Sequence, residues 1–86
     1  MKKQKLQAEV VKLERLQNSK NGNPKYAVTL ENGRTYKNSA DAGWVFGVDW
    51  EGVEPQTYVD ITYHETKSGR LVLDNLQIPA VRTEAV

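Results

Sequence analysis

Cationic and aromatic side chains lie on both sides of the Asn32-Gly33 pair in the first half of this 86-residue chain. Proteins that bind single-stranded nucleic acid combine cations along the phosphate backbone with rings that stack on bases, and each stack contributes about 1–3 kcal/mol. We therefore expect a nucleic-acid-binding surface in this region. Its predicted members are Lys20, Lys25, Arg34, Tyr36 and Lys37, with Trp50 as a second stacking ring.

The role of Tyr36 depends on the turn at Asn32-Gly33. If the turn has two residues, the Tyr36 ring lies on the face opposite Tyr26 and is free to stack on a base. If the turn has three residues with a bulge at Gly33, the register shifts by one and Tyr36 is buried with Val28. Opposite charges on the two sides of the turn favour the first register. A purely structural role, with lysines that only keep an edge strand soluble, stays open.

Two tryptophans form a second candidate site within residues 44–50, just before an acidic loop. Tryptophan is enriched at the centres of protein interfaces, so this segment could anchor a protein partner. A small barrel also needs bulky side chains to close its end. We expect Trp44 to serve that structural purpose, whereas both roles stay open for Trp50.

The charge is divided unevenly along the chain. Residues 1–37 carry nine basic and three acidic side chains, a net of +6, whereas residues 38–86 carry three basic and eight acidic ones, a net of −5. Such asymmetry predicts a polyanionic or acidic partner for the basic half. It also allows opposite halves of two copies to join in a homo-oligomer.

Several functional classes lack their sequence signals. The chain has no cysteine and one histidine, His64, which we interpret as a surface residue, so a dedicated zinc site is not expected. It has no phosphate-binding loop, dinucleotide glycine pattern or nucleophile elbow. We expect neither an enzyme nor a cofactor. No apolar run reaches the roughly 18 residues of a membrane span, and we expect a cytoplasmic protein without a membrane partner.

Alternating apolar and polar residues between turn signals predict one β-rich domain over residues 1–78, with a flexible tail at 79–86. A helix is the alternative for the first segment, because Leu6, Val10 and Leu13 also have helical spacing. A short helix is expected between Ser39 and Gly47. The predicted strands are residues 6–16, 25–30, 34–37, 57–63 and 70–74. Five strands with a helix after the third is the element order of an OB-fold barrel, and an SH3-like barrel is the alternative.

The first half of the chain also resembles a known group of proteins. The segment LERLQNSKNGNPKYAV at residues 13–28, followed by Gly33, Tyr36 and Asp41-Ala42, looks like a pattern in small phage and prophage proteins. The resemblance covers about residues 10–45, and its most specific part is the Asn-Ser-x-Asn-Gly-Asn-Pro loop. These are short accessory proteins, mostly without an assigned function. The resemblance therefore implies a phage-encoded cytosolic protein but no particular site residues.

Overall fold

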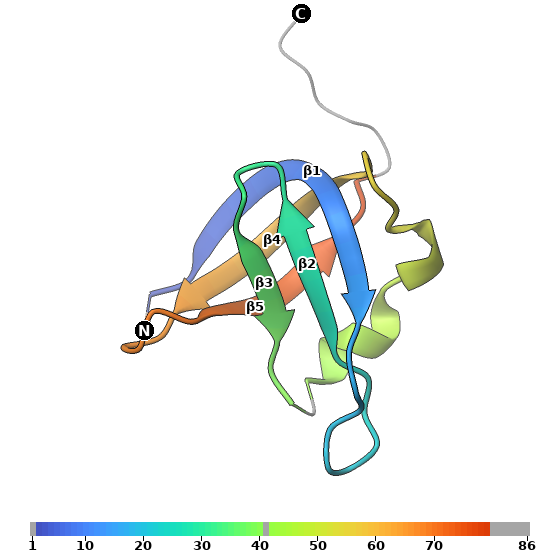
Figure 1. Ribbon diagram of the computed structural model, residues 1–86, viewed down its shortest axis with the longest axis vertical. Helices are drawn as coiled ribbons and strands as arrows, with labels where there is room; N and C mark the ends of the chain where they lie inside the picture. Colours follow the sequence, from blue (N-terminus) through green and yellow to red (C-terminus); the bar gives the residue numbers. More distant parts are fainter. Residues whose placement is uncertain (1, 41, 80–86) are drawn as a thin grey trace, which may run out of the picture.

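Five strands form a closed barrel in the order β1-β2-β3-β5-β4 (Figure 1). The computed structural model describes residues 2–40 and 42–79. All strand pairs are antiparallel except β3 with β5. This Greek-key order is that of the OB-fold and confirms the predicted all-β, five-stranded barrel. The strands are β1 (Gln4–Arg15), β2 (Tyr26–Leu30), β3 (Thr35–Asn38), β4 (Tyr58–Glu65) and β5 (Leu71–Gln77).

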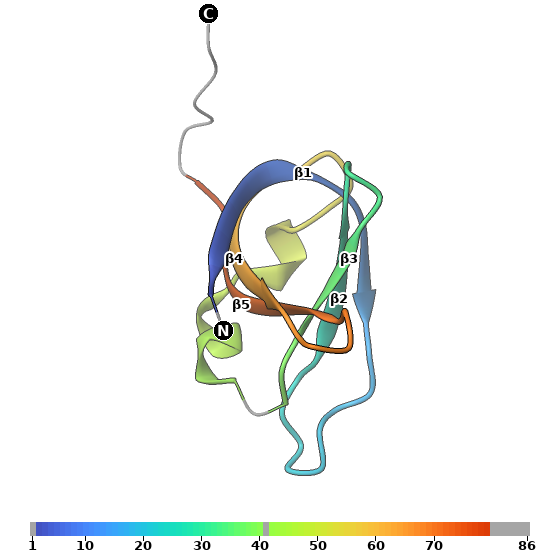
Figure 2. The ribbon, with the colours of Figure 1, turned by 90° about the vertical axis from the view of Figure 1, so that its left-hand side faces the viewer.

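The first segment is a strand, and a β-bulge explains why its apolar residues have helix-like spacing. β1 pairs with β4 through residues 4–9 and with β2 through residues 10–15, and the register shifts between Val10 and Lys12. Val11 is the extra residue and is 54% exposed. The next inward side chain after Val10 is therefore Leu13, three positions on, as it would be in a helix. The bend lets one long strand curve around two sides of the barrel, as Figure 2 shows.

The β2–β3 hairpin has the three-residue turn, so the favoured two-residue register is wrong. Val28 pairs with Tyr36, the Leu30 N–H donates to the Arg34 carbonyl at 3.0 Å, and Gly33 has a φ of +83°. Tyr36 consequently points into the barrel and is fully buried, at 0% exposure. Its ring meets that of Tyr63 edge to face at 4.9 Å between centroids.

The predicted helix after β3 is also wrong. Two 3-10 turns, η1 (Gly43–Gly47) and η2 (Trp50–Gly52), occupy the connection to β4. Ser39 is not the cap, because Ala42 precedes η1 and no side chain caps it. Glycine at both ends of η1 disfavours a regular helix. Trp44 is half-buried and packs against the core, as expected. The predicted tail at residues 79–86 lies outside the described residues, apart from Pro79.

The Gly33 turn predicts a specific stability difference. Gly33→Ala should lower the free energy of unfolding by about 1–2 kcal/mol, because an L-residue with a side chain disfavours this left-handed backbone conformation. The added Cβ would meet no atom within 4 Å at Gly33 or at the control position Gly47, which has no positive φ. Gly47→Ala should therefore leave stability unchanged or raise it by up to about 1 kcal/mol. Urea denaturation of both variants measures this difference, and equal midpoints would contradict it.

Candidate nucleic-acid interface

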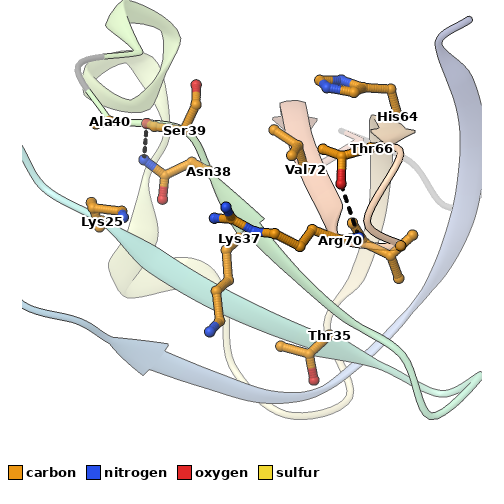
Figure 3. Close-up of a pocket in the computed structure, with 12 residues that line it drawn as sticks. Lys25, Thr35, Lys37, Asn38, Ser39, Ala40, His64, Thr66, Arg70 and Val72 are labelled. Atoms are coloured by element: carbon orange, nitrogen blue, oxygen red, sulfur yellow. Dashed lines mark hydrogen bonds between the residues drawn. The ribbon is translucent and has the colours of Figure 1, made fainter. Parts of the chain in front are cut away.

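The parallel β3–β5 pair joins two distant parts of the chain into one surface. Lys37 pairs with Val72, and Asn38 pairs with Leu73. The β4–β5 turn, from the acidic half of the chain, therefore lies beside the basic strand β3. Figure 3 shows the depression formed there, which has a volume of about 710 Å³, within the range of ligand pockets. Its lining residues are 25, 35, 37–40, 64, 66 and 69–72.

A second depression adjoins the first along the β1–β2 loop. It is lined by residues 16–21, 25 and 40, so it shares Lys25 and Ala40 with the first. We call the two depressions together the groove. None of the described residues that line it carries a carboxylate. Its four permanent cations are Lys20, Lys25, Lys37 and Arg70.

Asn38 fixes the floor of the groove. Its side chain is buried, at 2% exposure, and both ends of the amide are used. Oδ1 accepts a hydrogen bond from the Tyr26 backbone at 2.6 Å, and Nδ2 donates to the carbonyls of Pro24 at 3.2 Å and Ser39 at 3.1 Å. These bonds hold the chain on both sides of Lys25 against the end of β3. The sequence carried no signal for this role, because in a sequence a buried asparagine cannot be distinguished from the many asparagines that occur in exposed turns.

Arg15 fixes the β1–β2 loop. Its guanidinium donates to the backbone carbonyls of Leu16 at 2.8 Å and Lys25 at 3.3 Å, and also to Oδ1 of Asn18. The same group lies 5.2 Å from the centre of the Tyr26 ring, within the range of cation–π contacts. One side chain thus ties both ends of the loop that carries Lys20 to the barrel.

Arg70 joins the groove from the turn between β4 and β5, and no pattern in the sequence indicated it. Thr66 holds it in the turn, since its backbone N–H donates to the Arg70 carbonyl at 2.8 Å and its Oγ1 accepts from the Arg70 N–H at 3.0 Å. The Arg70 side chain extends toward β3 in Figure 3. In the sequence, Arg70 stands within the acidic half, and only the closure of the barrel places it beside Lys37.

His64 lines the groove near the end of β4 and is half-buried, which differs from the predicted surface position. Its Nδ1 lies 2.7 Å from Oδ2 of Asp74. The β4–β5 register shifts at this point, with Thr62 opposite Asn75 and Tyr63 opposite Leu73, so Asp74 is the bulged residue. The carboxylate of Asp74 is therefore already hydrogen-bonded to an imidazole.

The structure brings together three of the six predicted site residues. Lys20, Lys25 and Lys37 line the groove, whereas Arg34 is exposed at the hairpin turn and lines neither depression. The stacking role of Tyr36 is wrong because its ring is fully buried.

The other predicted stacking ring, Trp50, also does not line the groove. It stacks on Tyr26 at 3.9 Å between centroids and 11° between planes. Its Nε1–H donates to the Val45 carbonyl at 2.9 Å. Trp44 lies 6.2 Å away, between ring centroids. These contacts engage Trp50 within the fold, and Arg15 covers the stack from the side of Tyr26.

Comparisons with protein-family models, with known protein sequences and with solved structures found no match. The resemblance of residues 10–45 to small phage proteins therefore stays a prediction. Among the described residues, no three His, Asp or Glu side chains form a group that could hold a metal ion. No helix in this part of the chain has the length and apolarity required to span a bilayer.

Proposed function

We propose that this protein is a small non-enzymatic module that binds single-stranded nucleic acid in the groove. The observation that carries the proposal is the charge of the lining, which combines four cations with no carboxylate among the described residues. The formal charge of the whole chain is only +1, so the groove is far more cationic than the molecule as a whole. The groove also occupies the surface of β3 and the β1–β2 and β4–β5 loops, where OB-folds bind oligonucleotides.

The shape of the groove supports a single strand as the ligand. Its walls are two loops that Arg15 and Thr66 hold in place, and its floor is the end of β3. OB-folds that bind single strands use a positively charged groove of this kind to follow the strand's backbone. Cations along the floor and walls neutralise successive phosphates and release the counterions condensed on them, which drives association.

The proposal predicts binding with a definite salt dependence. We expect a fluorescein-labelled oligo-dT of about 12 nucleotides, within the site sizes of OB-folds, to bind at low salt. With four phosphate contacts, the logarithm of the association constant should fall with a slope of about −3 against the logarithm of salt concentration. Affinity then falls about 50-fold between about 50 and 200 mM salt. Fluorescence anisotropy measures it, and binding that is absent at low salt or indifferent to salt would overturn the proposal.

Binding of a protein partner is a second candidate, and one observation favours it. Phe46 in η1 is 67% exposed, although both neighbouring tryptophans are engaged within the fold. An exposed aromatic ring is the type of side chain that anchors protein interfaces. This candidate ranks second because one exposed ring is less than the contiguous apolar patch that marks most interaction sites. We also propose a phage origin, a cytoplasmic location and homo-oligomer formation. None of these three proposals involves particular residues of the groove.

A further inference from the structure

We infer that the groove binds nucleic acid through the sugar–phosphate backbone, with the bases turned toward solvent. This inference rests on the proposed function and specifies which part of the ligand the protein recognises. Most single-strand binders combine cations with aromatic platforms. The groove has the cations, but none of its described lining residues is a tyrosine, tryptophan or phenylalanine.

Every tyrosine, tryptophan and phenylalanine of the chain lies in the described part, and none lines the groove. Two rings, Tyr36 and Tyr63, are buried in the core. Trp44 and Trp50 pack against the core, and Tyr26 stacks on Trp50. The remaining two rings lie elsewhere, because the Tyr58 hydroxyl donates to Gln7 of β1 at 3.5 Å and Phe46 stands on η1.

The polar groups of the first depression, which lies along β3, suit phosphates better than base edges. A base edge is read by an amide that offers a donor and an acceptor together. Asn38, the amide at the floor, is buried and uses both of these groups within the protein. The imidazole of His64 is held by Asp74 through Nδ1. The other polar groups of the first depression are mainly cations and hydroxyls such as that of Ser39, which match the acceptor oxygens of a phosphate, whereas the amides of Gln17, Asn18 and Asn21 line the second depression.

The small apolar side chains that line the groove complete this picture. Ala40 and Val72 lie among the cationic and hydroxyl-bearing residues in the first depression. These short apolar side chains provide a surface against which a sugar can pack, but they offer no flat ring on which a base could stack. The phosphates of a bound strand therefore face β3, and the sequence of the strand has little effect on affinity.

An abasic oligonucleotide tests this inference directly. The probe is the labelled oligo-dT of about 12 nucleotides. The comparison strand has the same length and label but tetrahydrofuran residues in place of every nucleoside. We expect the two affinities to agree within about threefold and to show the same salt slope, because both strands carry the same phosphates. A protein that stacks bases would lose about 5- to 150-fold for each stack removed.

A matched pair of variants separates charge from ring-like stacking at Arg70, whose planar guanidinium could also lie on a base. Arg70→Ala should reduce the salt slope by about 0.7 for both strands, and the conservative Arg70→Lys should restore that slope, because the phosphate contact requires only the charge. Loss of affinity for the abasic strand by more than about 30-fold, with oligo-dT still bound, would overturn this inference alone. Failure to bind either strand at low salt would overturn the proposed function and this inference with it.

Discussion

The double variant Lys25→Glu/Lys37→Glu is expected to bind oligo-dT at least about 100-fold more weakly than the native protein at about 50 mM salt. Lys25 borders both depressions of the groove, and Lys37 stands on its floor. Each lost phosphate contact forfeits about 0.7 of a released counterion, which is worth about eightfold at this salt concentration. Two lost contacts account for about 60-fold, and the repulsion between the new carboxylates and the phosphates adds to it. Fluorescence anisotropy measures the change.

A second double variant controls for net charge. Lys5→Glu/Lys12→Glu makes the same change in formal charge, from +1 to −3, but neither lysine lines the groove. Lys5 lies opposite Thr62 of β4, and Lys12 is 3.4 Å from a carboxylate oxygen of Glu14. We expect this variant to lose at most about threefold in affinity, since screened charges outside the contact act weakly. Equal losses in the two double variants would show that the groove is not the binding surface.

Tyr36→Ala is expected to lower the free energy of unfolding by about 3–5 kcal/mol, as truncation of a large buried ring does. Tyr36 is fully buried, meets Tyr63 edge to face, and its hydroxyl accepts a hydrogen bond from Nδ2 of Asn32 at 3.0 Å. Small domains have only about 5–15 kcal/mol of total stability, so this variant should be partly unfolded at ambient temperature. Tyr36→Phe retains the ring and should lose only about 1 kcal/mol with the hydrogen bond.

The same variants decide between a structural and a binding role for Tyr36. Tyr36→Phe should bind oligo-dT as tightly as the native protein, because the hydroxyl does not reach the groove. The exposed neighbour Lys37 provides the opposite pattern, since Lys37→Ala should weaken binding about eightfold while changing stability by less than about 0.5 kcal/mol. Urea denaturation and anisotropy of the three variants measure both quantities. A stable Tyr36→Ala protein with weakened binding would restore the predicted stacking role.

Local patterns predicted the strands well, because alternation and turn chemistry depend on near neighbours in the chain. Val59, Ile61 and Tyr63 alternate into the barrel from β4, as their spacing indicates. The choice between strand and helix for β1 was ambiguous for a physical reason. The bulge at Val11 places successive inward side chains three residues apart, whereas a regular strand places them two apart. In η1, glycine at both ends outweighed the predicted capping by Ser39.

The predicted two-residue register of the first hairpin is wrong because the burial of Tyr36 outweighs the attraction between opposite charges at the turn. Opposite charges at an exposed turn contribute at most about 1 kcal/mol. Burying a large ring such as that of Tyr36 contributes about 1.5–3 kcal/mol or more. That burial is available only in the three-residue register, which places Tyr36 beside Val28 and against Tyr63.

The sequence by itself determined the strand-forming segments, the two hairpins and the concentration of cations around the first of them. Only the tertiary structure decided which cations share a surface, through the parallel pairing of β3 with β5. This pairing brings Arg70 to Lys37 and leaves Arg34 at the far turn of its hairpin. Contacts between strands this far apart depend on how the whole barrel closes around its core, and no short pattern of residues records that closure.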